Sequence, residues 1–219
     1  MGPVHRARDT QLGRTVAIKL TNGRDPERGQ ARAAHEARAL ARVEHPNVVT
    51  IFELGCDEDE SFMVMEFVEG TTFDHWMRSR TACCRELLRT CIDAGRGLAA
   101  AHRAGVVHCD FKPQNVLVDI RGQARVADFG VARFSGAEPP RGVGGHTPRY
   151  AAPEVLAGAK PDELSDQYSY CRTLLELTGD CAFRPLIEPV LERGCASEPG
   201  DRWADMDALL DAMVAATAS

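Results

Sequence analysis

Alternation between apolar and polar residues dominates the early part of the chain. A period of two, bounded by turn residues, predicts β-strands. Four runs have this pattern: Val4–Asp9, Arg14–Leu20, Val48–Leu54 and Ser61–Val68. Between the second and third runs, Asp25-Pro26-Glu27 provides the cap, the proline and the acid typical of a helix start, so we expect a helix from there to about Val43. The pattern predicts a small antiparallel sheet accompanied by one helix.

Helical spacing takes over from Cys83 onward. Apolar residues recur every three or four positions as far as Arg103, and Gly105 provides the C-terminal stop. A second helix is expected from residues 165–169 to Leu175, and a last amphipathic helix packs Met206, Leu209, Leu210, Met213 and Val214. Two short strand-like runs, 115–118 and 124–127, flank a turn at Gly122. The later part of the chain is therefore mainly helical, and the fold class is α+β.

Composition narrows the classes of protein. A chain of 219 residues is one large domain or two small lobes. Its net charge of −6 and pI near 5.7 argue against a nucleic-acid partner. No apolar run approaches the roughly 20 residues that a membrane helix needs, and no secretory signal is present. The eight cysteines lack the paired spacing of a zinc site. We therefore expect a cytoplasmic, reducing location.

The candidate chemistry lies in residues 108–130, HCDFKPQNVLVDIRGQARVADFG. A hairpin around Gly122 would bring Asp128 back beside Asn115, so that two oxygen ligands meet. Mg²⁺ that bridges phosphates needs few protein oxygens, because waters and substrate oxygens complete its shell. Asp110 would then accept the proton of an incoming hydroxyl, and Lys112 would neutralise charge on the moving phosphoryl group. These residue types in this order indicate metal-assisted phosphoryl transfer.

This stretch resembles the catalytic and magnesium loops of bacterial eukaryotic-like (Hanks-type) serine/threonine protein kinases. The family pattern H-R-D-x-K-x-x-x-N is present from His108 to Asn115, with Cys109 in place of the arginine, and D-F-G follows at 128–130. Because that arginine normally clamps a phosphorylated loop, we expect any activity to be independent of phosphorylation at Ser135. The resemblance also implies that His108 is a spine residue with Leu40, Ile51 and Phe129, and not a base.

For the smaller lobe, the resemblance implies a nucleotide site. Lys19 in Val16-Ala17-Ile18-Lys19 would hold phosphates and pair with Glu36 of the first helix. Only the last glycine and the valine of the glycine-rich loop match, so we expect Met1 to be an internal methionine, with the first strand and most of that loop missing. The Glu66 carbonyl and the Val68 amide would bond the adenine edge. The implied nucleotide contacts are Gly2, Val4, Ala17, Lys19, Met65, Glu66, Val68, Leu117 and Asp128.

On the substrate side, Thr147 in Thr147-Pro148-Arg149-Tyr150 would contact Asp110 and Lys112, although His146 replaces the usual glycine before it. Asp166 would bond the catalytic-loop backbone, and Arg202 would pair with Glu154 of Ala152-Pro153-Glu154. Asp166 and Arg202 are only 202 − 166 = 36 positions apart. Two helices of average length, about 11–12 residues, use most of that span, so we expect the family's helix G to be missing.

The resemblance implies a bilobal kinase fold, with an N-lobe of residues 1–68 and a C-lobe of residues 69–219. It implies ATP and Mg²⁺ as cofactors, a protein Ser/Thr hydroxyl as acceptor, and a role in signalling. Two alternatives stay open. The first is a kinase-fold binding or scaffold module. It would be excluded if the purified protein transferred phosphate and Asp110→Asn abolished that transfer. A small-molecule phosphotransferase of the aminoglycoside or choline kinase type shares H-x-D-x-x-x-x-N but lacks D-F-G and A-P-E.

Overall fold

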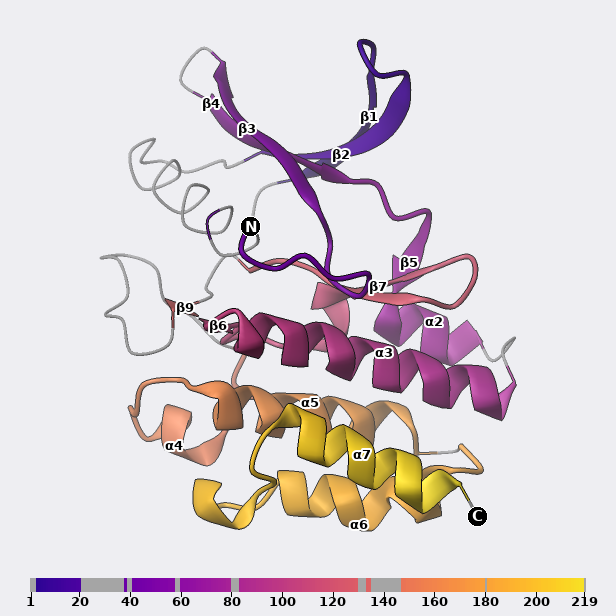
Figure 1. Ribbon diagram of the computed structural model, residues 1–219, viewed down its shortest axis with the longest axis vertical. Helices are drawn as coiled ribbons and strands as arrows, with labels where there is room; N and C mark the ends of the chain where they lie inside the picture. The colour runs from indigo at the N-terminus through magenta and orange to yellow at the C-terminus, as the bar shows by residue number, and fades with distance from the viewer. Residues whose placement is uncertain are drawn as a thin grey trace.

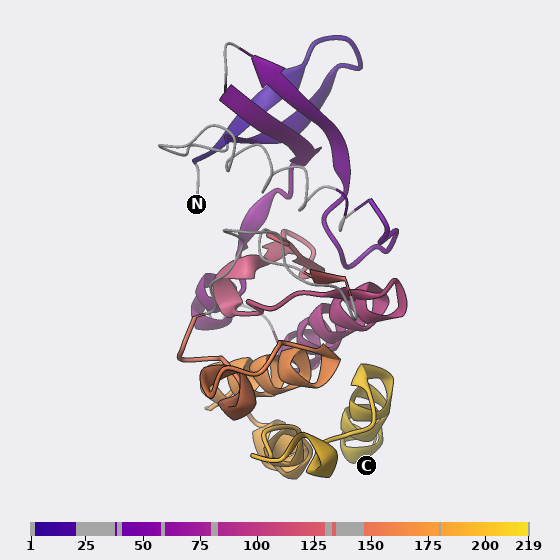
Figure 2. The same cartoon turned by 90° about the vertical axis from the view of Figure 1, so that its left-hand side faces the viewer.

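The structure is a computed structural model. It describes residues 3–20, 38, 41–57, 60–79, 83–129, 133–134, 147–179 and 181–218. Figure 1 shows two parts, with a β-sheet at the top and a layer of helices at the bottom, and Figure 2 shows the same stacking from the side. The fold class is thus α+β, as predicted. The helix expected from Asp25 to about Val43 falls almost wholly outside the described residues.

A four-stranded antiparallel sheet forms the upper part. Its strands are β1 (Val4–Asp9), β2 (Arg14–Leu20), β3 (Ile51–Asp57) and β4 (Glu60–Glu66), in the order β1-β2-β4-β3. The turn between β1 and β2 is closed by Asp9, whose carboxylate accepts hydrogen bonds from two backbone amides, at Gln11 and Leu12. The first two strands have the predicted bounds, and the turn chemistry explains why.

The third strand begins later than the sequence pattern predicts. Residues 47–49 pair with the lower part of the molecule: the Asn47 carbonyl accepts a 2.8 Å hydrogen bond from the Val126 amide, and the Val49 amide donates a 2.9 Å bond to the Val126 carbonyl. The side chains of Val48 and Val49 are buried there. Local alternation cannot reveal this pairing, because the partner lies far along the chain.

The lower part combines short strands with helices. A three-stranded sheet, in the order β5-β7-β8, and the β6–β9 pair form its upper surface. The strands are β5 (Gly70–Thr72), β6 (Val106–Val107), β7 (Val116–Asp119), β8 (Ala124–Val126) and β9 (Arg133–Phe134). The helices are α2 (Phe73–Ser79), α3 (Cys84–Arg103), α4 (Pro153–Leu156), α5 (Glu163–Leu177), α6 (Arg184–Gly194) and α7 (Met206–Thr217), with 3-10 turns at Pro113–Asn115 and Pro199–Asp201.

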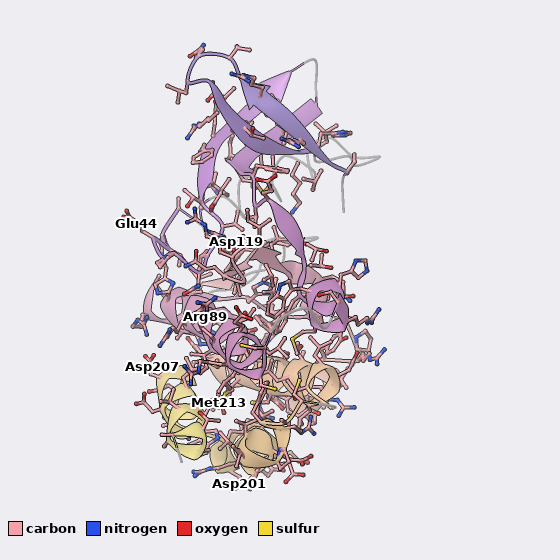
Figure 3. All side chains as sticks on the ribbon, turned by 90° about the vertical axis from the view of Figure 1, so that its right-hand side faces the viewer. Glu44, Arg89, Asp119, Asp201, Asp207 and Met213 are labelled. Atoms are coloured by element: carbon pink, nitrogen blue, oxygen red, sulfur yellow. The ribbon has the colours of Figure 1, made fainter. Side chains whose placement is uncertain are left out.

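The hydrophobic core lies between α3, α5, α6, α7 and the β7–β8 hairpin. Figure 3 shows Met213 on the inner side of α7 and Asp207 on its outer side. Val214, expected in the core, is 46% exposed. It lies about 90° around the helix from the centre of the buried stripe, because each residue turns the helix by about 100°. That prediction was wrong at the edge of the stripe.

One connection in the helical layer is short, as the spacing predicts. Helix α5 ends at Leu177 and α6 begins at Arg184. Of the connecting residues 178–183, all but 180 are described, and those form turns. Arg184 closes the connection by donating a 2.7 Å hydrogen bond to the Leu175 carbonyl. In the described residues the chain therefore passes from α5 to α6 without an additional helix.

Candidate active site

Helix α5 fixes the catalytic-loop backbone through Asp166. Its carboxylate accepts hydrogen bonds from the amides of His108 and Cys109, at 2.6 and 2.8 Å. Cys109 has φ of 66°, a left-handed conformation that is uncommon for a non-glycine residue. Such strain persists where the surrounding structure enforces it, and the buried Asp166 carboxylate does so here. The predicted contact is confirmed.

A contact of His102 with Asp166 was not predicted by the sequence analysis. The Nε2 atom of His102, in the last turn of α3, lies 3.0 Å from Oδ2 of Asp166. The side chain of Asp166 is 1% exposed, and that of His102 is 10% exposed. The two residues are 64 positions apart in the sequence. The one local signal for their contact is that a histidine, His102, follows the apolar residues 98–101 of α3. Asp166 therefore joins α3, α5 and the catalytic loop.

Asp110, Lys112 and Thr147 form a closed triangle of hydrogen bonds. Nζ of Lys112 lies 2.6 Å from Oδ2 of Asp110 and 2.8 Å from Oγ1 of Thr147. The hydroxyl and the amide of Thr147 each donate to Oδ1 of Asp110, both at 2.8 Å. The expected contacts of Thr147 are thus present. The carboxylate already accepts a hydroxyl donor, which is the geometry a general base requires.

Asn115 supplies a buried oxygen without a partner. Its Nδ2 donates a 2.9 Å hydrogen bond to the Asp110 carbonyl. Its Oδ1 is buried and accepts no hydrogen bond from the residues that the structure describes. Since buried polar atoms are nearly always paired, such an atom calls for an explanation, and an absent ion is one. An amide oxygen is a suitable ligand for a hard cation.

The β7–β8 hairpin places Asp128 close to Asn115, as predicted. The Ala127 amide donates a 2.8 Å hydrogen bond to the Asn115 carbonyl, and the hairpin turns at Gly122, where φ is 75°. Asp128 itself has φ of 61°. The residue that carries the amide oxygen thus pairs through its backbone with the neighbour of the residue that carries the carboxylate. Together with waters and phosphate oxygens, the amide oxygen and the carboxylate fit the few protein ligands that Mg²⁺ needs.

Lys19 connects the upper sheet to this pair. Its Nζ lies 2.8 Å from Oδ1 of Asp128, and the two side chains are 9% and 17% exposed. Glu36, the other expected partner of Lys19, lies outside the described residues, as does Gly2. The Lys19–Glu36 pair therefore stays a prediction, whereas a contact between Lys19 and the magnesium-loop carboxylate is observed.

The strand register places the expected nucleotide contacts on one face of the sheet. Val4 pairs with Lys19, and Ala17 pairs with Met65. Directly paired residues of antiparallel strands share a face, and residues two positions apart in a strand do so as well. Val4, Ala17 and Met65 therefore share the face from which Lys19 reaches Asp128. Leu117 lies below, on β7, opposite Thr72.

The segment that joins the two parts is held by an ion-pair chain that the sequence analysis missed. Glu66 ends β4, and its carboxylate contacts Nε of Arg125 at 3.1 Å. Arg125 on β8 also contacts Asp119 at 2.9 Å. Figure 3 labels Asp119 between the sheet and the helices. This chain fixes Glu66, and thereby the path of the backbone towards Val68, against the β7–β8 hairpin.

His108 is a packing residue, as the resemblance implies. It is fully buried, and its ring lies 4.7 Å from that of Phe129 and 5.9 Å from that of Phe111. Its Nε2 lies 3.1 Å from the Ala127 carbonyl. Ile51 packs against the core, whereas Leu40 lies outside the described residues. This packing leaves Asp110 as the candidate base.

Glu154 and Arg202 form the expected pair below the site. The guanidinium donates two hydrogen bonds to the carboxylate, at 2.7 and 2.8 Å, in a bidentate arrangement. Burial is the largest single effect and raises the pKa of Glu154, but the hydrogen bonds from Arg202, a backbone hydrogen bond and the charge of Arg202 together outweigh burial and lower this pKa. Arg202 also donates to the Ala196 and Leu164 carbonyls. The pair holds the segment that carries Thr147 against α5.

A fold of this kind with this arrangement of Asp, Lys, Asn and Asp defines a phosphotransferase of the kinase class. A family model described as a protein kinase domain matches residues 1–188. The kinase domain of Mycobacterium tuberculosis PknI superposes with a TM-score of 0.76 at 26% sequence identity, covering 99% of this chain and 92% of that domain. The chain belongs to the protein kinase family.

Within that family the chain is similar to bacterial proteins named as serine/threonine-protein kinases. It is 41% identical to the serine/threonine-protein kinase pkn2 of Myxococcus xanthus, over 91% of this chain and 25% of that protein. It is 37% identical to the probable serine/threonine-protein kinase pknA2 of Bifidobacterium longum, over 77% of this chain and 23% of that protein. For PknL of Mycobacterium tuberculosis the identity is 32%, over 94% of this chain and 60% of that protein. The chain thus spans about a quarter to three fifths of these curated relatives.

Among the described residues, no helix is both long enough and apolar enough to cross a lipid bilayer.

Proposed function

We propose that this chain transfers the terminal phosphate of ATP to a serine or threonine hydroxyl of a protein, with Mg²⁺. The observation that carries the proposal is the contact of the Thr147 hydroxyl with both Asp110 and Lys112, at 2.8 Å each. A hydroxyl is held there between a carboxylate that can accept its proton and an ammonium that can neutralise phosphoryl charge. This is the requirement for phosphoryl transfer to an alcohol.

The proposed roles follow from the contacts. Asp110 orients the acceptor hydroxyl and takes its proton. Lys112 stabilises the charge that builds up on the transferred group. Thr147 fixes Asp110 and Lys112 relative to each other. Asp166 acts through the backbone of the catalytic loop, and Glu154 acts through the segment that carries Thr147. Both are therefore positioning residues that touch no reacting atom.

The residues fit a magnesium ion with its nucleotide. Asn115, through its unpartnered Oδ1, and Asp128 would hold the ion, which when bound neutralises phosphate charge. Lys19 would bind phosphate oxygens from the sheet side, with Glu36 as its second acidic partner. Asn115, Asp128 and Lys19 offer the atoms for these contacts in buried or half-buried positions.

The adenine contacts are assigned to the face of the sheet shared by Val4, Ala17 and Met65. The Glu66 carbonyl and the Val68 amide would bond the base edge. Leu117 would close the site from the β7 side, and Gly2 would approach the phosphates. Support comes from the strand register, which places the three apolar side chains on the face from which Lys19 extends.

We further assign residues 1–68 to an N-lobe and residues 69–219 to a C-lobe, with the nucleotide between them. A cytoplasmic signalling role that acts on proteins and not on nucleic acids accords with the net charge of −6. The position of Cys109, where an arginine would clamp a phosphorylated loop, supports activity that is independent of phosphorylation at Ser135, a residue outside the described part. A large rate gain on phosphorylating Ser135 would contradict this.

Phosphoryl transfer by the purified chain tests the proposal. With labelled ATP, Mg²⁺ and a generic protein acceptor, we expect incorporation that Asp110→Asn lowers by about 10²–10⁴-fold. Asp207→Asn is the matched control, because that carboxylate is exposed and far along the surface, on α7. Transfer to aminoglycosides or amino-alcohols and not to protein would favour the small-molecule alternative. Nucleotide binding without any transfer would favour the binding module.

A further inference from the structure

Two cysteines that the proposed mechanism does not use, Cys171 and Cys195, lie where the end of α6 packs against α5. Cys171 lies on α5 and is fully buried, and Cys195 follows the last residue of α6 and is partly exposed. The Cys195 thiol donates a 3.9 Å hydrogen bond to the carbonyl of Tyr168, which lies one helical turn before Cys171 on α5. The close approach has a local cause at Gly194: a Cβ atom there would lie 2.3 Å from Sγ of Cys171. Only a glycine before Cys195 lets the end of α6 come this near to α5.

The surroundings make Cys195 the nucleophile of the two. The hydrogen bond from Cys171 lowers the pKa of the Cys195 thiol, and Arg172 and Arg202 act in the same direction against the effect of burial. Burial raises the pKa of Cys171, which stays a thiol. Thiolate character and access to solvent together decide which cysteine reacts with oxidants. A partly exposed thiol with a lowered pKa next to a buried thiol with a raised pKa is the arrangement of a reactive and a resolving cysteine.

We propose that Cys171 and Cys195 are an oxidation site that hydrogen peroxide converts to a disulfide between α5 and the end of α6. In the first step the Cys195 sulfur attacks one peroxide oxygen, the O–O bond breaks, and the departing hydroxide takes up a proton to become water. In the second step the Cys171 sulfur displaces the oxygen of the sulfenic acid, which leaves as a second water with the Cys171 proton. Two thiols are oxidised, one peroxide is reduced, and a dithiol reverses the bond by exchange.

The disulfide has a defined route to the active site. The residues after Cys195 hold Arg202: its guanidinium donates hydrogen bonds to the carbonyls of Ala196 and Ser197, at 2.9 and 3.4 Å. Arg202 in turn holds Glu154. A covalent bond at Cys195 displaces the backbone that supplies these carbonyls, and the displacement reaches the segment that carries Thr147. The effect on activity, unlike the bond itself, rests on the proposed function.

Mapping the bond by mass spectrometry tests the site directly. Trypsin releases Cys171 in residues 150–172 and Cys195 in residues 194–202, whereas Cys181 lies in a third peptide, 173–193. The chain is treated with hydrogen peroxide, alkylated, and digested without reduction. We expect the linked pair 150–172 with 194–202. It should disappear after reduction with a dithiol and be absent from Cys195→Ser treated in the same way.

Cys83→Ser is the matched control, because Cys83 is exposed and lies at the start of α3. It should leave the linked pair unchanged. The proposal is wrong if both thiols stay open to alkylation after peroxide treatment, if Cys195 ends as a sulfinic acid without a link, or if Cys171 links mainly to another cysteine. Phosphoryl transfer should fall in proportion to the linked fraction and recover with the dithiol. An inactive chain that still forms the link would refute the proposed function and leave the oxidation site standing.

Discussion

Lys19 and Asp128 are 109 positions apart in the sequence, yet Nζ of the lysine lies 2.8 Å from Oδ1 of the aspartate. The lysine comes from the sheet and the aspartate from the segment after β8. Two predicted site residues that are far apart in the sequence thus form an ion pair. The contact prearranges a cation and an anion, both of which a magnesium-bound triphosphate can use.

We predict that Lys19→Met weakens nucleotide binding and abolishes transfer while the chain remains folded. Hydrogen bonds to charged groups contribute about 1.5–3 kcal/mol each, so the loss of one to a phosphate should raise the Kd by roughly 10- to 150-fold. The measurement is the rise in Tm on adding ATP with Mg²⁺, which reports binding to the folded state. Lys160→Met, at an exposed position, is the control. Equal Tm shifts in the two variants would remove Lys19 from the nucleotide site.

A second prediction concerns Asp166, which accepts from two backbone amides and contacts His102. Asp166→Asn replaces one acceptor oxygen by a donor, so one of these groups loses its partner. We expect a cost of about 1.5–3 kcal/mol, a fall in Tm of roughly 4–10 °C, and a lower kcat as Cys109 relaxes. Asp207→Asn should change stability by less than about 0.5 kcal/mol. Unchanged kcat in Asp166→Asn would show that the catalytic loop keeps its shape without this carboxylate.

A third prediction concerns acid stability. The pKa of Glu154 is below its ordinary value of 4.5, since burial, which raises it, is outweighed by the hydrogen bonds and charge of Arg202 together with a backbone hydrogen bond. The folded state therefore binds its proton less readily than the unfolded state. The resulting stability is fully present above about pH 4.5 and is lost as the pH falls through the lowered pKa. The urea midpoint of the wild type should thus fall more steeply below about pH 4.5 than that of Glu154→Gln. Parallel curves would mean that the pair contributes no pH-dependent stability.

Packing between the lobes gives a fourth prediction. A Cβ atom at Gly97 of α3 would lie 2.2 Å from the Asn47 carbonyl oxygen. Alanine favours a helix by about 1 kcal/mol over glycine, yet we expect Gly97→Ala to destabilise by about 1–3 kcal/mol, because backbone has to move. Gly200→Ala meets no atom within 4 Å and is the control. Urea denaturation measures the free energy of unfolding of both variants. If Gly97→Ala is more stable than the wild type, the backbone at residues 45–49 can move away from α3 without a loss of stability.

Local patterns predicted much of the fold and most of the site. Strands β1 and β2 and helix α3 follow from alternation, turn residues and helical spacing. The ordered residues Asp110, Lys112, Asn115 and Asp128 indicated the chemistry because a hairpin of that length leaves few ways to place them. Their described contacts agree with that reasoning, whereas the roles assigned to them stay predictions.

Contacts between distant segments could not be predicted in this way. Residues 47–49 alternate like a strand of the upper sheet but pair with Val126. The contact of His102 with Asp166 and the meeting of Cys171 with Cys195 depend on how α3, α5 and α6 pack, which no single segment encodes. The unpartnered oxygen of Asn115 is likewise a property of its surroundings.

The backbone bond from the Glu66 amide to the Thr50 carbonyl, 2.8 Å long, and the pairing of Ile51 with Met65 hold the start of β3 beside the end of β4. Lys19 and Asp128 come from the two parts of the molecule that these segments connect, so their separation depends on how the sheet sits on the lower part. The triangle of Asp110, Lys112 and Thr147 is built wholly from the lower part. A shift of the sheet would therefore change the first contact and leave the second intact.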